Sequence, residues 1–302
     1  MVMKYRKVIG SFITYVLMCV AAPYAVAQTQ MLGVLERVPG VYAREPASYH
    51  VRVLFLKRGT GWEAFPSKCM TQTCLKEITR FYPNKVRWYL GANGEEAGHI
   101  DAITPNDFSY YAHVGLQNIL TGLPTKAKTG LIGQKRDDAR GQVLAVANTR
   151  PFFGAIRNWR KLKPEKQVAP SINYTIRRRV ASMYQLWRSR NLYSSKICPW
   201  LTKDFSAYES ENHEYLIGIN FSQDSRCADY DATSAFDNSW FLYRQDAKIK
   251  YLGSGLRLID HEEVSRNGGE VFIFEINKTN LGGYKIFYDG FARYAEYSFI
   301  YH

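Results

Sequence analysis

Short runs of alternating apolar residues, separated by turn residues, recur along most of this chain. In one case, residues 50–56 and 62–65 flank residues 58–61, which include two glycines. In another, residues 86–90 and 97–100 flank Asn93 and Gly94, a pair that supplies the positive φ angles of tight hairpin turns. Similar runs cover residues 143–147, 215–221, 240–243, 248–252, 271–276, 284–288 and 294–301. The sequence therefore predicts an all-β, mainly antiparallel fold, propeller-like or sandwich, with at most one or two helices.

Two segments depart from this strand pattern. Residues 122–141 are rich in Gly, Lys and Thr, which is typical of a long loop or a weak internal junction. In the second segment, apolar residues recur at the helical intervals of 4, 4, 3 and 4, in Ile172, Ile176, Val180, Met183 and Trp187. A strand is the alternative there, because several of the same residues are β-branched or aromatic. We expect residues 28–302 to form one β-rich domain with a junction near 122–141.

Residues 1–27 have the features of a secretory signal peptide. A basic head is followed by a mostly apolar stretch, and Ala25-Val26-Ala27 places small residues before a cleavage site. We expect cleavage after Ala27 and a periplasmic or extracellular location, with no transmembrane segment in the processed chain. An uncleaved anchor is the alternative, but the apolar stretch is shorter than the roughly 20 residues needed to cross a bilayer. A lipid-modified Cys19 is a further alternative, although Met18 precedes it.

Four cysteines lie outside the leader, and an even number in an exported chain is typical of disulfides. They are Cys69, Cys74, Cys198 and Cys227. Three pairings are possible, and we favour Cys69 with Cys74 and Cys198 with Cys227 because each of these loops is local. Zinc is the alternative for the closely spaced first pair, but no second Cys or His pair at short spacing would complete the ligand set.

Positive charge is concentrated in one window. The full chain has a formal net charge of +13, and the leader accounts for three of the basic residues. Between Arg157 and Arg190 there are ten basic residues and one acid, Glu165. Such a patch attracts an anionic polymer or an anionic lipid surface. The candidate ligand-binding residues are Arg177, Arg178, Arg179, Trp187 and Arg188. A solvated, merely exposed face is the alternative, and nucleic acid is not an expected partner of an exported protein.

Oxygen-bearing side chains alternate at Glu263, Ser265 and Asn267, before two glycines and the strand pattern of 271–276. Loops of this kind wrap calcium with side-chain and backbone oxygens. With the tail that follows, this segment resembles a degenerate calcium-loop repeat of the FG-GAP or VCBS type in an exported bacterial β-rich protein. The resemblance implies calcium as a cofactor. Only Glu263 of the three candidate metal ligands carries a full negative charge, so we expect weak calcium binding or none.

Enzyme motifs were sought along the whole chain. There is no G-x-S-x-G nucleophile elbow and no H-E-x-x-H pair, and the six histidines are scattered. No residue is therefore assigned as catalytic. We expect an exported, non-enzymatic binding protein that contacts an anionic envelope or surface component. An exported hydrolase whose carboxylates meet only in the fold is the alternative. An outer-membrane barrel is a third, suggested by the alternating residues at 295–301.

Overall fold

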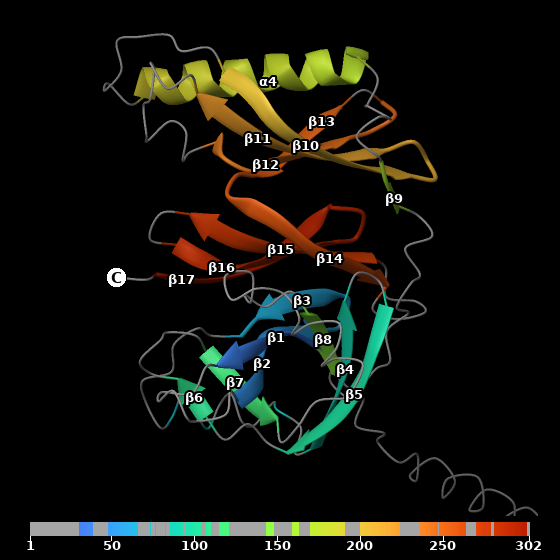
Figure 1. Ribbon diagram of the computed structural model, residues 1–302, viewed down its shortest axis with the longest axis vertical. Coiled ribbons are helices and arrows are strands. Elements are labelled where there is room, and N and C mark those ends of the chain that lie inside the picture. The colour runs from blue at the N-terminus through green and yellow to red at the C-terminus, as the bar shows by residue number, and fades with distance from the viewer. Residues whose placement is uncertain are drawn as a thin grey trace, which may run out of the picture.

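The structure of the chain, a computed structural model, consists of stacked β-sheets with one long helix on the outside (Figure 1). It describes residues 30–38, 48–65, 73, 76, 82, 85–92, 95–103, 107–109, 115–120, 143–147, 159–162, 170–190, 200–223, 236–246, 248–263, 270–278 and 281–300. The predicted leader, the four cysteines and the 122–141 segment lie outside these residues, so the predictions made for them stay predictions.

The N-terminal sheet has eight strands in the order β5-β4-β8-β1-β2-β7-β6, with β3 pairing β2. Its strands are β1 (Met31–Val38), β2 (Ser48–Arg58), β3 (Gly61–Ala64), β4 (Lys85–Ala92), β5 (Glu95–Ile103), β6 (Asp107–Ser109), β7 (Gly115–Leu120) and β8 (Val143–Ala147). Ala92 pairs with Glu95, so β4 and β5 form the hairpin predicted around Asn93 and Gly94. Strand β8 pairs with both β1 and β4, which returns the chain to this sheet after the 122–141 segment.

Two further sheets follow in the chain. The helix-bearing sheet has the order β13-β12-β11-β10-β9, and the C-terminal sheet has the order β14-β15-β16-β17. Their strands are β9 (Trp159–Lys161), β10 (Trp200–Ser210), β11 (Tyr215–Gln223), β12 (Ser239–Tyr243), β13 (Ile249–Gly253), β14 (Leu256–Glu263), β15 (Glu270–Lys278), β16 (Leu281–Tyr288) and β17 (Arg293–Ile300). Neighbouring strands are antiparallel in both sheets, and each sheet is open, with an edge strand at either side.

The helix α4 (Pro170–Arg190) covers the outer face of the helix-bearing sheet (Figure 1). Its apolar stripe of Ile172, Ile176 and Val180 is buried against strand residues that include Ile217 and Phe241. The helix predicted from the 4, 4, 3, 4 spacing is therefore confirmed, and the strand alternative is wrong. Burial of this stripe together with Met183 explains the outcome, because residues three and four apart share one face of a helix, whereas a strand would turn Met183 to the face opposite Ile172 and Ile176.

The C-terminal sheet lies between the other two sheets and is buried on both faces (Figure 1). Along β15, Val271 and Ile273 pack into the core shared with the N-terminal sheet. The alternate residues Phe272, Phe274 and Ile276 pack into the core shared with the helix-bearing sheet. Because successive strand side chains point to opposite faces, a continuous apolar run is the pattern of a strand covered on both sides. This layering confirms the all-β prediction and decides for stacked sheets over a propeller.

Polar contacts join the layers in addition to the apolar cores. The Trp159 indole nitrogen donates to Glu270 Oε2 at 2.8 Å, joining β9 to β15. Arg244 Nη2 donates to the Gly290 carbonyl at 2.7 Å, and Lys250 Nζ donates to the Phe291 carbonyl at 2.6 Å. Both carbonyls belong to the turn between β16 and β17, where Asp289 and Gly290 have φ of 54° and 57°. This Asp-Gly turn thus receives side chains from the neighbouring sheet.

Among the described residues, no helix combines the length and the apolar character that crossing a bilayer requires. Residues 31–38, 200–210 and 256–263, which carry no strand prediction above, also form strands. The first of these contains Gly33, which sits at a register shift opposite Val53. The irregular alternation that accompanies such a bulge is the reason the pattern is weak there.

Candidate binding surface

The outward face of α4 is built by the same periodicity that buries its inner face. Arg177, Arg178 and Arg179 follow the buried Ile176 directly, and all three are exposed. No Asp or Glu occurs anywhere in the helix. Two further arginines, Arg188 and Arg190, lie in its last turn, where the helix macrodipole favours positive charge. The side chains of Trp187 and Arg188 are outside the described part, so the structure places these two candidate residues on the helix and no further.

Aromatic and aliphatic side chains share this face with the arginines. Tyr174 is 62% exposed and Leu186 is 54% exposed. The Arg178 guanidinium carbon lies 5.8 Å from the centroid of the Tyr174 ring, the geometry of a cation–π contact. Arg177 Nε donates to Asn173 Oδ1 one turn earlier, at 3.2 Å. These contacts hold the guanidinium groups of Arg177 and Arg178 over the helix surface without supplying a negative charge.

The arginines of the sheets are arranged differently. Six of them lie within 4.0 Å of a carboxylate, in the pairs Arg52 with Glu36, Arg58 with Glu63, Arg87 with Asp101, Arg160 with Glu209, Arg244 with Glu214 and Arg257 with Glu275. Within the described part of the chain, no carboxylate pairs with the arginines at 177–179. Guanidinium groups bind carboxylate, phosphate and sulfate oxygens in a bidentate manner. The helix therefore presents unpaired anion-binding groups on one face.

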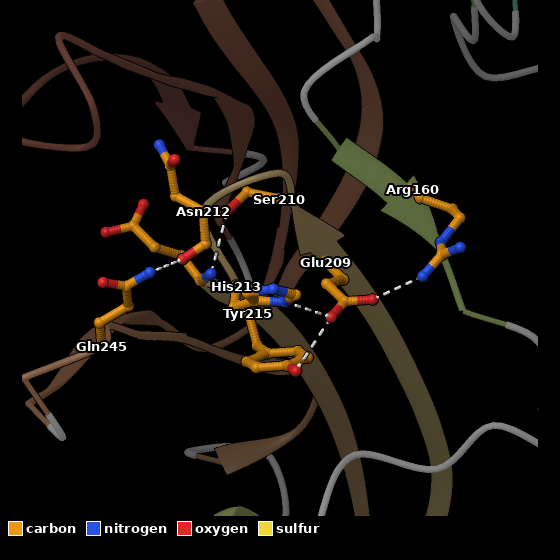
Figure 2. A network of polar contacts seen from close by, with 8 residues as sticks. Arg160, Glu209, Ser210, Asn212, His213, Tyr215 and Gln245 are labelled. Carbon is orange, nitrogen blue, oxygen red and sulfur yellow. Dashed lines mark hydrogen bonds and ion pairs between the residues drawn. The ribbon is translucent and has the colours of Figure 1, made fainter.

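A second polar cluster lies at the hairpin between β10 and β11 and includes Arg160 of the basic window (Figure 2). Glu209 accepts hydrogen bonds from His213 Nδ1 at 3.0 Å, from the Tyr215 hydroxyl at 3.1 Å and from Arg160 Nη2 at 2.7 Å. The bond from His213, followed by that from Arg160, holds the pKa of Glu209 below its usual value. The Glu209 side chain is only 15% exposed.

The hydrogen bonds of this cluster stabilise the turn between β10 and β11. Ser210 Oγ accepts from the Glu214 backbone amide at 2.9 Å, and the His213 amide donates to the Ser210 carbonyl at 3.0 Å. His213 has φ of 54°, so its left-handed backbone is held by these bonds. Glu209, Ser210, His213 and Tyr215 are thus bonded within the turn, and Arg160 joins them from β9. Arg160, whose side chain is 69% exposed, is thus taken out of the basic surface by Glu209.

A buried charged cluster between the N-terminal and C-terminal sheets escaped the sequence interpretation. Glu36 on β1 lies directly opposite His50 on β2, and its Oε2 accepts from His50 Nε2 at 2.9 Å and from Arg52 Nη2 at 2.7 Å. Arg52 also lies over the ring of Phe299, 5.3 Å from its centroid. Burial by itself would raise the pKa of Glu36, but the hydrogen bond from His50 and the charge of Arg52 outweigh it, so the pKa is lowered. The sequence signal that could have indicated this cluster is the alternation of His50 and Arg52 with valines in a strand pattern.

Neither histidine cluster resembles the site expected of a hydrolase. Glu36 meets His50 and Glu209 meets His213, so each histidine contacts one carboxylate. In the described ranges, no group of three His, Cys, Asp or Glu side chains comes together in a way that could hold a metal. Hydrolases that rely on paired carboxylates need two in reach of the same bond. The hydrolase alternative therefore gains no support from these two clusters.

The predicted calcium loop joins two neighbouring strands. Glu263 ends β14 and pairs in register with Glu270 at the start of β15, so residues 264–269 connect the two strands of a hairpin. Ser265 and Asn267 lie outside the described residues. The Glu270 carboxylate is the acceptor of the Trp159 indole bond and serves the contact between sheets. The calcium prediction for Glu263, Ser265 and Asn267 therefore stays a prediction.

No family model, no curated protein and no solved structure matches this chain. No relative therefore contributes a substrate, a partner or a set of site residues. The candidate surface on α4 has to be judged by its own charge, exposure and contacts.

Proposed function

We propose that this protein is a non-enzymatic binding protein that contacts an anionic partner through the outward face of α4. The observation that carries the proposal is the contrast in pairing. Arg177, Arg178 and Arg179 are exposed and have no carboxylate partner in the described part, whereas six arginines on or beside the sheet strands are paired with carboxylates. A positive surface that the protein does not neutralise itself attracts anions from outside.

The proposal includes export of the protein. The leader at residues 1–27 is removed after Ala27, and the processed chain acts in the periplasm or outside the cell. There the chain is cross-linked by disulfides between Cys69 and Cys74 and between Cys198 and Cys227. Intact-mass measurement of protein from the culture medium and from the periplasm, with and without reduction, tests this: loss of the first 27 residues and a gain of about 4 mass units on reduction are expected.

The binding test replaces Arg177, Arg178 and Arg179 together with Gln. Two probes carry the shared chemistry, namely vesicles containing anionic phospholipid and soluble polyphosphate. Each arginine near an anionic surface contributes about 1 kcal/mol, so loss of three weakens binding by about 3 kcal/mol, or about 100-fold. The binding of the unchanged protein should weaken as salt is raised, because exposed charges are screened.

A matched control removes the same charge elsewhere. Lys85 and Lys278 are exposed on strands and Lys248, which pairs with Asp246, is exposed just before β13, so their replacement by Gln lowers the net charge by the same three units. If binding reflected only the overall charge of the protein, both variants would lose affinity equally. A loss confined to the helix variant supports the proposal, and an equal loss or no loss contradicts it.

A further inference from the structure

The exposed apolar side chains of α4 point to the kind of anionic partner. We infer that the partner is an anionic lipid surface, on which α4 lies flat with Tyr174 and Leu186 entering the interface between headgroups and acyl chains; this inference rests on the proposed function. Large exposed apolar side chains in the described part are Tyr174 and Leu186 on α4 and Tyr294 and Ile300 on β17. Half of this small set therefore lies on the helix that carries the unpaired arginines.

The spacing along the helix places these groups in one row that winds around its exposed side. Positions 174, 178, 182 and 186 are each four residues apart, so the row of Tyr174, Arg178, Ser182 and Leu186 turns by about 40° around the axis at each step. At a rise of about 1.5 Å per residue, Tyr174 and Leu186 are about 18 Å apart along the axis. Ser182 satisfies its hydroxyl internally by donating to the Arg178 carbonyl at 3.1 Å, so it offers little resistance to leaving water.

The arginines flank this row. Arg177 lies on one side of it and Arg179 on the other, because successive residues of a helix are rotated by about 100°. Arg178 lies on the row itself, in contact with the Tyr174 ring. The helix packs on the sheet through Ile172, Ile176, Val180 and Met183, and no other described element lies over its outward face (Figure 1). Helices that lie in a membrane interface combine these features: basic flanks, an apolar row and an axis parallel to the surface.

A soluble polyanion would use only part of this face. Polyphosphate and acidic polysaccharides bind the guanidinium groups, but they have no apolar phase that could receive Leu186. A lipid surface places anionic headgroups beside acyl chains, so the arginines and Leu186 are satisfied together, and the amphipathic ring of Tyr174 suits the boundary between them. The presence of arginines together with Tyr174 and Leu186 on the exposed side of α4 therefore favours a lipid surface as the partner.

The test replaces Tyr174 and Leu186 together with Ala and leaves all the arginines in place. We expect binding to vesicles of anionic phospholipid to weaken about 10-fold and binding to soluble polyphosphate to stay unchanged. The matched control is the double replacement of Tyr294 and Ile300 with Ala, since these side chains are 59% and 53% exposed on β17. This control should bind both probes like the unchanged protein. Circular dichroism and thermal unfolding check that each variant is folded.

The outcomes separate the two proposals. If the replacement at 174 and 186 leaves vesicle binding unchanged while the triple arginine replacement weakens binding to both probes, the partner is a soluble polyanion and the lipid inference is overturned. If the triple arginine replacement weakens neither, the proposed function itself fails. If the β17 control loses as much vesicle binding as the helix variant, the apolar contact is not specific to α4, and the lipid inference is again overturned.

Discussion

Two groups of arginines in this protein differ in their exposure to solvent and in their pairing with carboxylates. Arg52 lies between the N-terminal and C-terminal sheets with a side chain that is 10% exposed, and it is held by Glu36 and by the ring of Phe299. Arg178, on the outer layer, is exposed, and the ring that its guanidinium contacts belongs to Tyr174 of its own helix. A charge enclosed between layers must be matched by the protein, whereas a charge on the outermost helix can be left for a partner. Stability and binding should therefore depend on different arginines.

The largest effect is expected at the enclosed arginine. Replacement of Glu36 with Gln removes the counter-charge of Arg52, whose Nε already has no hydrogen-bond partner in the described structure. Breaking a buried pair from one side leaves a charge in a medium that solvates it poorly, so the free energy of unfolding should fall by about 3–5 kcal/mol. Urea unfolding followed by circular dichroism measures this change.

The exposed pair on the same sheet provides the control. Arg58 and Glu63 are 49% and 58% exposed, so replacement of Arg58 with Gln should change the free energy of unfolding by about 1 kcal/mol or less. If the two variants lost similar stability, enclosure between the sheets would not be what distinguishes Arg52, and the comparison would fail.

The pH dependence of the free energy of unfolding provides a second test of the buried pair of Glu36 and Arg52. The pKa of Glu36 is lower in the folded protein than its ordinary value of 4.5. Its contribution is therefore complete above about pH 4.5 and is lost as the pH falls through the folded-state pKa. Other carboxylates behave similarly, among them Glu209. The specific expectation is that the stability gap between the unchanged protein and its Glu36→Gln variant narrows between about pH 6 and about pH 3. A constant gap would contradict it.

The strand pattern and the helix spacing were sufficient to predict most elements, because each depends on burial of one local face. The apolar run at 271–276 even held the information that both faces are covered, since it does not alternate with polar residues. The partners of charged residues could not be predicted in this way. Glu36 and Arg52 are 16 residues apart, and Trp159 and Glu270 are 111 residues apart. Such contacts depend on strand register and on the stacking of sheets.

The same limit affected the basic window. Its ten charges were treated as one patch, but its members have different surroundings. Arg160 belongs to strand β9 and is neutralised by Glu209, while Arg177, Arg178 and Arg179 belong to the helix and are not. Only the cross-strand pairing of Arg160 with Glu209 separates these two groups, and that pairing follows from the register of β9 against β10.

Arg160 is an intermediate case and should show a small effect. Its replacement with Gln removes one of three donors to Glu209 and leaves His213 and Tyr215 in place. Because Arg160 is 69% exposed, solvent screens most of the interaction, and the free energy of unfolding should fall by less than about 1 kcal/mol. The pKa of Glu209 should move upward, toward its ordinary value, which NMR titration of the carboxyl carbon measures. A fall as large as that at Glu36 would show that exposure does not control the cost.

The smallest effect on stability per replaced residue is expected where the effect on binding is largest. Joint replacement of Arg177, Arg178 and Arg179 with Gln removes no ion pair with a described carboxylate and leaves the buried stripe of α4 intact. Gln and Arg have similar helix propensities, so the free energy of unfolding should change by less than about 0.5 kcal/mol per residue. Urea unfolding of this variant, compared with Glu36→Gln, measures the separation directly. A destabilisation above about 3 kcal/mol would mean that these arginines hold the helix to the sheet. They would then be structural, and the distinction between matched and available arginines would not hold.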